Sequence, residues 1–200
     1  MIGAPIVAAA TVSQGWLSVT ELIGQGVSPA EGVWRYLCYF TVLTNTFVVL
    51  VLARAALAPQ SRTGLNAPRI ELMAVTSILF VGAVYNLLLA SQWDPQGLRK
   101  FNDVTLHVAS PLLFTLFWLS RPHGALNWRD ALYCALWPGA YSIYALTRGA
   151  VDGFYPYYFI NPANMPWPHV AFNMAGLIIV FTLAALLLAA LANARHRQRA

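Results

Sequence analysis

Charged residues are scarce in this chain, and their scarcity excludes an ordinary water-soluble domain. The 200 residues include 12 basic and 7 acidic ones, so 10% of the sequence is charged while 58% is hydrophobic. Soluble domains carry roughly 25% charged residues because water must solvate most of their surface. Together with a mean hydropathy of +0.58, this composition predicts a chain that is surrounded by lipid.

The chain also has few cysteines, no basic residue before its first apolar stretch and no internal repeat. The two cysteines, Cys38 and Cys134, both lie in apolar stretches and form neither a disulfide framework nor a CxxC metal site. No basic residue precedes the first apolar stretch, so we interpret that stretch as a retained helix rather than a cleaved signal. The absence of an internal repeat disfavours a transporter built from inverted repeats.

Six apolar segments follow one another, separated by loops rich in glycine, proline and polar residues. A run of ~20 apolar residues is enough to cross a bilayer, so six helices account for nearly the whole chain. The predicted helices cover residues 2–23, 34–58, 70–91, 104–120, 131–147 and 169–191. The sequence therefore predicts an all-α, polytopic membrane protein that forms one domain over residues 1–200.

Basic residues are distributed unevenly between alternate loops. Eight arginines fall on the side of the two termini: Arg54, Arg62, Arg69, Arg121, Arg129, Arg195, Arg197 and Arg199. Four basic residues fall on the opposite side, and the positive-inside rule then predicts an inner-membrane protein with both termini in the cytoplasm. The basic tail is of the kind that meets anionic lipid headgroups. We expect membrane lipids as partners and no nucleic acid, and the sequence predicts no oligomeric state.

Polar side chains in the second predicted helix lie on one face. Cys38, Thr41, Thr44 and Asn45 are spaced by three and four residues, which aligns them along a helix. Polar groups are costly inside a membrane, so such a face indicates a site. The alternative is structural: threonine hydroxyls such as that of Thr44 can bond a carbonyl of their own helix, and Cys38 can be a small core residue.

An ionisable pair marks the fourth predicted helix. Asp103 and His107 are four residues apart, so they stack on one face near the outer end of the helix. Pro111 removes the hydrogen bond that the His107 carbonyl would otherwise accept, which leaves a free acceptor beside the imidazole. Tyr85 and Asn86 lie in the outer half of the third helix. We expect these groups to form a site that faces the outer leaflet.

These residue types can support nucleophilic catalysis. A hydroxyl group that an imidazole can deprotonate is the minimum requirement, and a carboxylate one turn away can orient that imidazole. We interpret Thr41 as the nucleophile and His107 as the general base, and Asp103 or Asn45 as the group that orients the imidazole or stabilises the oxyanion. Cys38 is an alternative nucleophile. Two further polar residues are expected to support the site: Thr44 and Asn86. This interpretation requires no metal and no cofactor.

Three segments resemble a known family when they are taken in order. They are WRYLCYFTVLTN at residues 34–45, Leu106-His107 with Pro111, and GFYPY at residues 153–157. The same order occurs in the androgen-induced, FAR-17a-like membrane proteins, whose bacterial relatives are called Pr-six-Pr family membrane proteins. The resemblance covers residues 32–191 and implies a threonine hydrolase that cleaves branched fatty acid esters of hydroxy fatty acids.

The resemblance also implies roles for particular residues. His107 matches the family's histidine, because a proline follows it four residues later. Alignment on the Phe-Thr pair places the family's threonine at Thr41, whereas its distance from the preceding tryptophan places it at Cys38. We prefer Thr41. The expected partner is thus an acyl ester drawn from the membrane.

Other functions are compatible with the same residues. His107 and His169 could be axial ligands of a haem in a redox or cofactor-binding protein. A non-catalytic scaffold or a small permease is a further alternative, although the lack of repeats and of buried charge pairs disfavours transport.

Overall fold

The computed structural model describes residues 3–197, and every regular element in that range is helical. Five helical stretches are long and apolar enough to cross a membrane: Gly3–Gly24, Phe40–Leu57, Pro68–Gln92, Leu98–Ser120 and Trp167–Arg197. The predicted all-α, polytopic fold class is therefore confirmed. Arg199, which entered the charge count above, and Ile2, the expected start of the first helix, lie outside the described residues.

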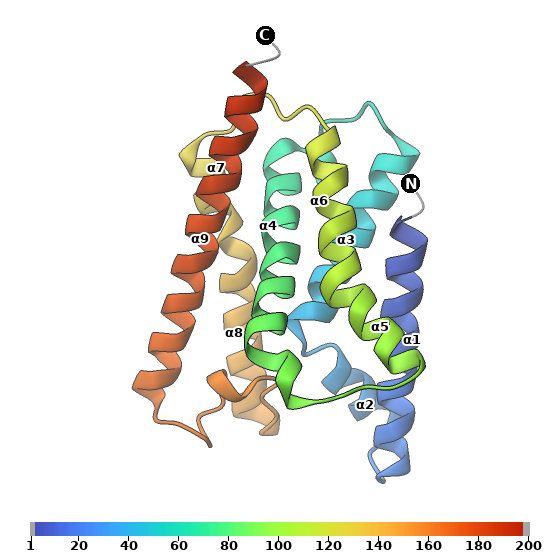
Figure 1. Cartoon of the computed structure of the whole chain (residues 1–200). Helices are drawn as coiled ribbons and strands as arrows, with labels where there is room; N and C mark the ends of the chain where they lie inside the picture. The colour runs from blue at the N-terminus through green and yellow to red at the C-terminus, as the bar shows by residue number, and fades with distance from the viewer. Residues whose placement is uncertain (1–2, 198–200) are drawn as a thin grey trace.

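The bundle is built around helix α4 (Pro68–Val84), which contacts α3 (Phe40–Leu57), α6 (Ser110–Ser120) and α9 (Trp167–Arg197) (Figure 1). Most of its middle residues are buried, as expected for a helix that is apolar all round and therefore packs on several sides. Helix α1 (Gly3–Gly24) lies at the periphery, beside α3. The core of the molecule thus follows α4 from one end to the other.

The two ends of the bundle differ in charge. The loops 58–67 and 121–127 and the end of α9 lie together at the end drawn at the top of Figure 1. We call this the basic end, because Arg62, Arg121 and Arg195 lie there. The connections 93–97 and 153–166 lie at the opposite end, which we call the site end. Its placement in the outer leaflet stays a prediction.

The prediction of one continuous helix over residues 34–58 is wrong. The structure has α2 (Pro29–Tyr36), a break at residues 37–39, and then α3. Tyr39 at the break is extended, with φ −78° and ψ 130°. The carbonyls freed by the break accept hydrogen bonds from α8 (Leu136–Asp152): Tyr141 donates to Cys38, Tyr144 to Leu37 and Arg148 to Trp34. Those side chains make the break tolerable at membrane depth, where free backbone groups are costly.

The fifth predicted helix, residues 131–147, is also interrupted. It corresponds to α7 (Trp128–Cys134) and α8, which are separated at Ala135. The reason is Pro138, because its nitrogen cannot donate to the carbonyl of Cys134 four residues earlier. Neither piece is one of the five long apolar stretches.

The remaining helices match their predictions more closely. The first helix is continuous over Gly3–Gly24, the third extends over Pro68–Gln92, and the last runs from Trp167 to Arg197. The fourth begins at Leu98 rather than at residue 104, so that α5 (Leu98–Val104) carries Asp103. Between α5 and α6, residues Thr105–Ala109 form a π-helical turn.

Candidate functional site

Thr41 and His107 meet at the site end, as their placement in the sequence predicted. Thr41 is the second residue of α3, because the break at residues 37–39 makes that helix begin at Phe40. His107 lies in the middle of the π-helical turn Thr105–Ala109. The Thr41 Oγ1 and His107 Nε2 atoms are 3.4 Å apart. Catalytic hydrogen bonds are often long in the absence of substrate, so this distance suits a nucleophile and its base.

Asp103 holds the other side of the imidazole ring. His107 Nδ1 donates a hydrogen bond to the Asp103 carbonyl at 3.0 Å, and the carboxylate oxygen Oδ1 lies 3.1 Å from the same nitrogen. Two acceptors around Nδ1 favour the tautomer that carries its proton there. The lone pair of Nε2 then faces the Thr41 hydroxyl, which is the arrangement that a general base requires.

Pro111 and the polar groups packed against the His107 carbonyl account for the π-helical turn. The His107 carbonyl, which Pro111 leaves without its usual donor, lies 3.5 Å from Asn86 Nδ2. The same amide donates to the Gly82 carbonyl at 2.8 Å. Gly82 permits this close approach, since a Cβ atom at its position would lie 3.0 Å from the His107 carbonyl oxygen and would push the two helices apart. Asn86 thus supports the site by joining α4 to the turn that carries His107, and π-helical turns are frequent at functional sites.

Tyr85 and Trp93 complete the packing on this side of the site. The sequence placed Tyr85 beside Asn86 in the outer half of the third helix, but it indicated no role in the site for Trp93. The rings of Tyr85 and His107 are stacked, with centroids 3.5 Å apart and planes 10° apart. Trp93 donates to the Tyr85 hydroxyl at 2.8 Å. The stacking of Tyr85 on His107 and the hydrogen bond from Trp93 could not be predicted, because contacts between helices leave no spacing pattern in the sequence.

Asn45 and Thr44 support the packing around Thr41. The Asn45 side-chain amide donates to the carbonyls of Thr41, at 2.9 Å, and Leu106, at 3.3 Å. It therefore joins α3 to the helix of His107 and has no hydrogen left for a substrate. Thr44 is fully buried and accepts a hydrogen bond from Trp137 at 3.1 Å.

Cys38, the alternative nucleophile, lies in the break between α2 and α3. Its side chain is fully buried, and burial raises the pKa of its thiol, which disfavours the thiolate. It lines neither of the two cavities that border Thr41. The geometry thus places Thr41, and not Cys38, against the imidazole.

A large chamber borders Thr41 on one side. Its volume is about 610 Å³, within the range of roughly 300–1,000 Å³ that small-molecule sites occupy. It is open to the outside and lies among α1, α2, α3 and α5, with His107 and Asp103 in its wall. Its other polar lining residues are Gln14, Ser18, Glu21, Gln25, Arg35, Gln92 and Arg99.

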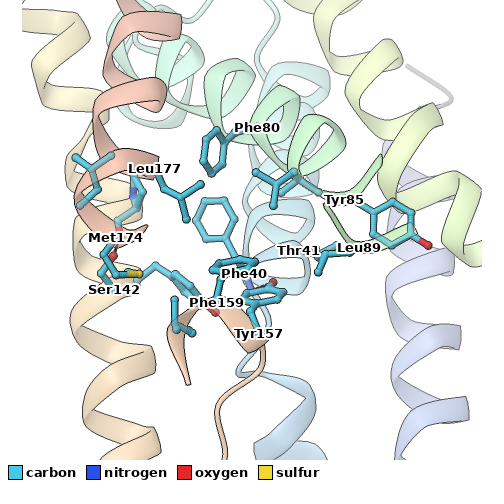
Figure 2. A pocket seen from close by; sticks show the side chains of 16 residues that line it. Phe40, Thr41, Phe80, Tyr85, Leu89, Ser142, Tyr157, Phe159, Met174 and Leu177 are labelled. Atoms are coloured by element: carbon cyan, nitrogen blue, oxygen red, sulfur yellow. Dashed lines mark hydrogen bonds between the residues drawn. The ribbon is translucent and has the colours of Figure 1, made fainter. Parts of the chain in front are cut away.

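A smaller, apolar groove of about 60 Å³ borders Thr41 on the other side. Figure 2 shows Thr41 and Tyr157 toward one end of this groove and Met174 and Leu177 of α9 at the other. The remaining lining comes mainly from aromatic and aliphatic side chains of α3, α4 and α8. Thr41 therefore lines both cavities, of which the chamber alone carries charged side chains.

His169, the second ligand of the haem alternative, lies in the first turn of α9 and is exposed. His107 is held by protein groups at both nitrogens, Asp103 at Nδ1 and Thr41 near Nε2. Within residues 3–197, no group of three or more His, Cys, Asp or Glu side chains is arranged to hold a metal ion.

The site combines a hydroxyl, an imidazole and a carboxylate, which come from α3, the π-helical turn and α5. The relative positions of these groups suit acyl transfer through a hydroxyl nucleophile. Comparison of the chain with protein-family models, with curated proteins and with solved structures found no match.

Proposed function

We propose that this chain is a membrane-embedded hydrolase of lipid esters, with Thr41 as nucleophile and His107 as general base. The observation that carries the proposal is the position of the Thr41 hydroxyl, 3.4 Å from His107 Nε2, at the lining of both an apolar groove and a larger chamber that carries polar and charged groups. The resemblance to the androgen-induced, FAR-17a-like proteins supports the same reaction. The site end then faces the outer leaflet of the inner membrane.

The two cavities suggest how a substrate binds. The acyl carbons next to the ester carbonyl fit the groove, whose wall is almost entirely apolar, and the rest of the acyl chain extends into lipid. The alcohol part of the ester fits the chamber, which is larger and offers amide, hydroxyl and charged groups. The proposed substrates are therefore amphiphilic esters whose alcohol part is bulky and carries polar groups.

The first half of the reaction forms an acyl-enzyme. The Thr41 oxygen attacks the ester carbonyl carbon while its proton moves to His107 Nε2. The Asp103 carboxylate, 3.1 Å from Nδ1, stabilises the positive charge that develops on the ring. The tetrahedral intermediate then collapses, and Nε2 returns the proton to the departing alcohol oxygen, which leaves through the chamber.

The second half of the reaction regenerates the threonine. Water reaches the acyl carbonyl from the chamber, and His107 removes a proton from it as it attacks. When the second intermediate collapses, the proton returns to the Thr41 oxygen and the fatty acid is released toward the groove.

Hydrolysis of a p-nitrophenyl ester of a medium-chain acid tests the proposal in purified, folded protein. We expect Thr41→Ala to lower kcat by at least about 10³-fold, because no other hydroxyl replaces the nucleophile. Thr46→Ala is the matched control, since Thr46 lies on the same helix, is exposed and donates to the Val42 carbonyl. Full activity of Thr41→Ala, with a normal melting temperature, would contradict the proposal.

A further inference from the structure

Tyr157 brings to the site a second hydroxyl group that the mechanism above does not use. It lies in the 153–166 connection and, like Thr41, lines both the chamber and the groove. Its ring is stacked on Phe159, with centroids 5.2 Å apart and planes 2° apart. The ring of Tyr39 meets it edge-on at 6.0 Å. Contacts on two sides fix the direction of the Tyr157 hydroxyl.

The Tyr157 hydroxyl is bound to the start of α3. Its oxygen accepts a hydrogen bond from the amide of Phe40, the residue before Thr41, at 3.0 Å. A phenol that accepts one hydrogen bond still has its own hydrogen to donate. That hydrogen is therefore available beside the atom that attacks the substrate.

The Thr41 amide is a second donor at this place. The first amides of a helix have no partner within the helix. In α3, the Phe40 amide donates to Tyr157, and those of Val42 and Leu43 donate to the Tyr39 carbonyl. The Thr41 amide has no backbone acceptor in the described part of the chain; it lies near the Tyr157 oxygen and would turn to the substrate oxygen when a substrate binds. The positive end of the helix dipole also lies here and favours a negative charge.

We propose that the Tyr157 hydroxyl and the Thr41 amide form the oxyanion hole of this site, an inference that rests on the proposed hydrolase function. When the Thr41 oxygen bonds to the carbonyl carbon, the π electrons of the carbonyl move to its oxygen. That oxygen accepts hydrogen bonds from both donors, and Tyr157 keeps its proton throughout. Tyr157 is then a catalytic residue, and it takes the role that the sequence pattern suggested for Asn45.

The state of Tyr157 at neutral pH fits this role. Burial raises the pKa of its hydroxyl to about 12, although contacts with Thr41 and Phe40 oppose the rise. The phenol is therefore protonated at pH 7 and donates rather than accepts. A donor that is already in place needs no reorganisation when the charge develops, which is why such donors contribute strongly to catalysis.

Two measurements on Tyr157→Phe test the proposal with the full chain. We expect hydrolysis of a p-nitrophenyl ester to fall about 10²–10³-fold in kcat, the usual cost of removing one oxyanion donor. We expect the affinity for octyl trifluoromethyl ketone, whose adduct with Thr41 carries an oxyanion, to fall by a similar factor. The KM for the ester should change less than threefold. Tyr144→Phe is the matched control, because Tyr144 donates to the Leu37 carbonyl and lines neither cavity.

A second variant keeps the test decisive if Tyr157→Phe does not fold. Replacement of Tyr157 by a fluorotyrosine preserves its shape and its contact with Phe40 but makes the hydroxyl a stronger donor. We expect this protein to bind the ketone more tightly than the unmodified protein does. Unchanged affinity would overturn the oxyanion role.

The outcomes separate the two proposals. If Thr41→Ala is inactive but Tyr157→Phe stays within threefold of the unmodified protein in both measurements, the oxyanion role is wrong and the hydrolase proposal stands. If Thr41→Ala is fully active, the hydrolase proposal fails, and the role of Tyr157 fails with it.

Discussion

The two ends of the bundle both bury polar groups, but they hold them in opposite ways. At the basic end, the side chain of Glu71 is fully buried, and its Oε1 accepts hydrogen bonds from Arg62 and Arg121, each at 3.0 Å. At the site end, His107 and Thr41 face an open chamber of about 610 Å³. Polar groups are costly inside a membrane wherever they lie. The Glu71 carboxylate is fully bound by protein groups, whereas the Thr41 hydroxyl lines a chamber from which a ligand can reach it.

Helix geometry differs between the ends in the same way. The break at residues 37–39 and the π-helical turns Tyr85–Leu89 and Thr105–Ala109 all lie toward the site end. Each interruption aims a side chain or a backbone amide that a regular helix would direct elsewhere. The break at Ala135, by contrast, follows from Pro138 and carries no site residue. The candidate active site is thus distinguished from the structural ion cluster by interrupted helices that carry its side chains, and not by polarity alone.

The largest expected effect separates catalysis from stability at the site end. His107→Ala should lower kcat for ester hydrolysis by about 10³–10⁴-fold, because the nucleophile loses its base. The melting temperature should change little, since the imidazole is stacked at the edge of a cavity and not in the core. Kinetics and thermal unfolding of the same preparation check this, and a His107→Ala protein with normal turnover would remove the base from the mechanism.

Glu71→Ala, at the basic end, should lower the stability of the protein and leave its turnover unchanged. Removing the carboxylate leaves two guanidinium groups without their shared partner, which costs about 3–5 kcal/mol for a buried pair. The kcat of the folded fraction should be unchanged, because Glu71 lies at the other end of the bundle. Glu31→Ala is the control, since the exposed Glu31–Arg35 pair contributes at most about 1 kcal/mol. The free energy of unfolding in mixed micelles measures both, and equal losses in the two variants would contradict this account.

Asp103→Asn should have a smaller effect on turnover than the loss of a triad aspartate usually has. His107 Nδ1 donates to the Asp103 carbonyl, which the substitution keeps, so the ring should hold its tautomer. Only the charge beside the ring is lost, and we expect kcat to fall about 10–10²-fold rather than the ~10⁴-fold seen when the tautomer changes. A loss near 10⁴-fold would mean that the carboxylate, and not the carbonyl, orients the imidazole.

The smallest expected effect is a pH dependence of stability at the basic end. Burial, together with the nearby Arg62, Arg121 and Arg195, lowers the pKa of His123 to about 4, although its hydrogen bond to the Trp118 carbonyl opposes the shift and Glu71 Oε2 lies 3.7 Å from its Nδ1. The unfolded chain therefore binds a proton at higher pH than the folded chain does. Stability should be complete above about pH 6.5 and fall toward pH 4, by on the order of 1–2 kcal/mol at pH 5.

Thermal unfolding across this pH range checks the effect of His123. His123→Phe keeps an aromatic ring against Trp118, on which His123 is stacked with centroids 4.5 Å apart. This variant should lose the part of the pH dependence that lies between pH 6.5 and 4. A variant with the same slope as the unmodified protein would assign the titration to another group.

The sequence was sufficient to predict the fold class and most of the membrane crossings, because length and hydropathy decide both. It also placed Thr41, His107 and Asp103 together, since the cost of intramembrane polar groups marks their positions. It could not predict the break at residues 37–39. Nothing in that apolar run interrupts a helix by itself, and the break depends on donors from α8 that lie about 100 residues away.

The same limit explains which contacts of the site the sequence did not indicate. Tyr85 and Trp93 resemble ordinary interfacial aromatics until their contacts with His107 and with each other are visible. Tyr157 lies in a loop, and its hydrogen bond to Phe40 joins residues 117 positions apart. Contacts of this kind depend on how the helices pack.

Covalent labelling tests the central claim, that Thr41 is the nucleophile, most directly. Folded protein is treated with a lipophilic alkyl fluorophosphonate and digested, and the modified residue is located by mass spectrometry. We expect the phosphonyl group on Thr41 and no adduct in His107→Ala, because the threonine needs its base to react. An adduct on Cys38, or a folded protein that is not modified at all, would contradict the assignment of Thr41.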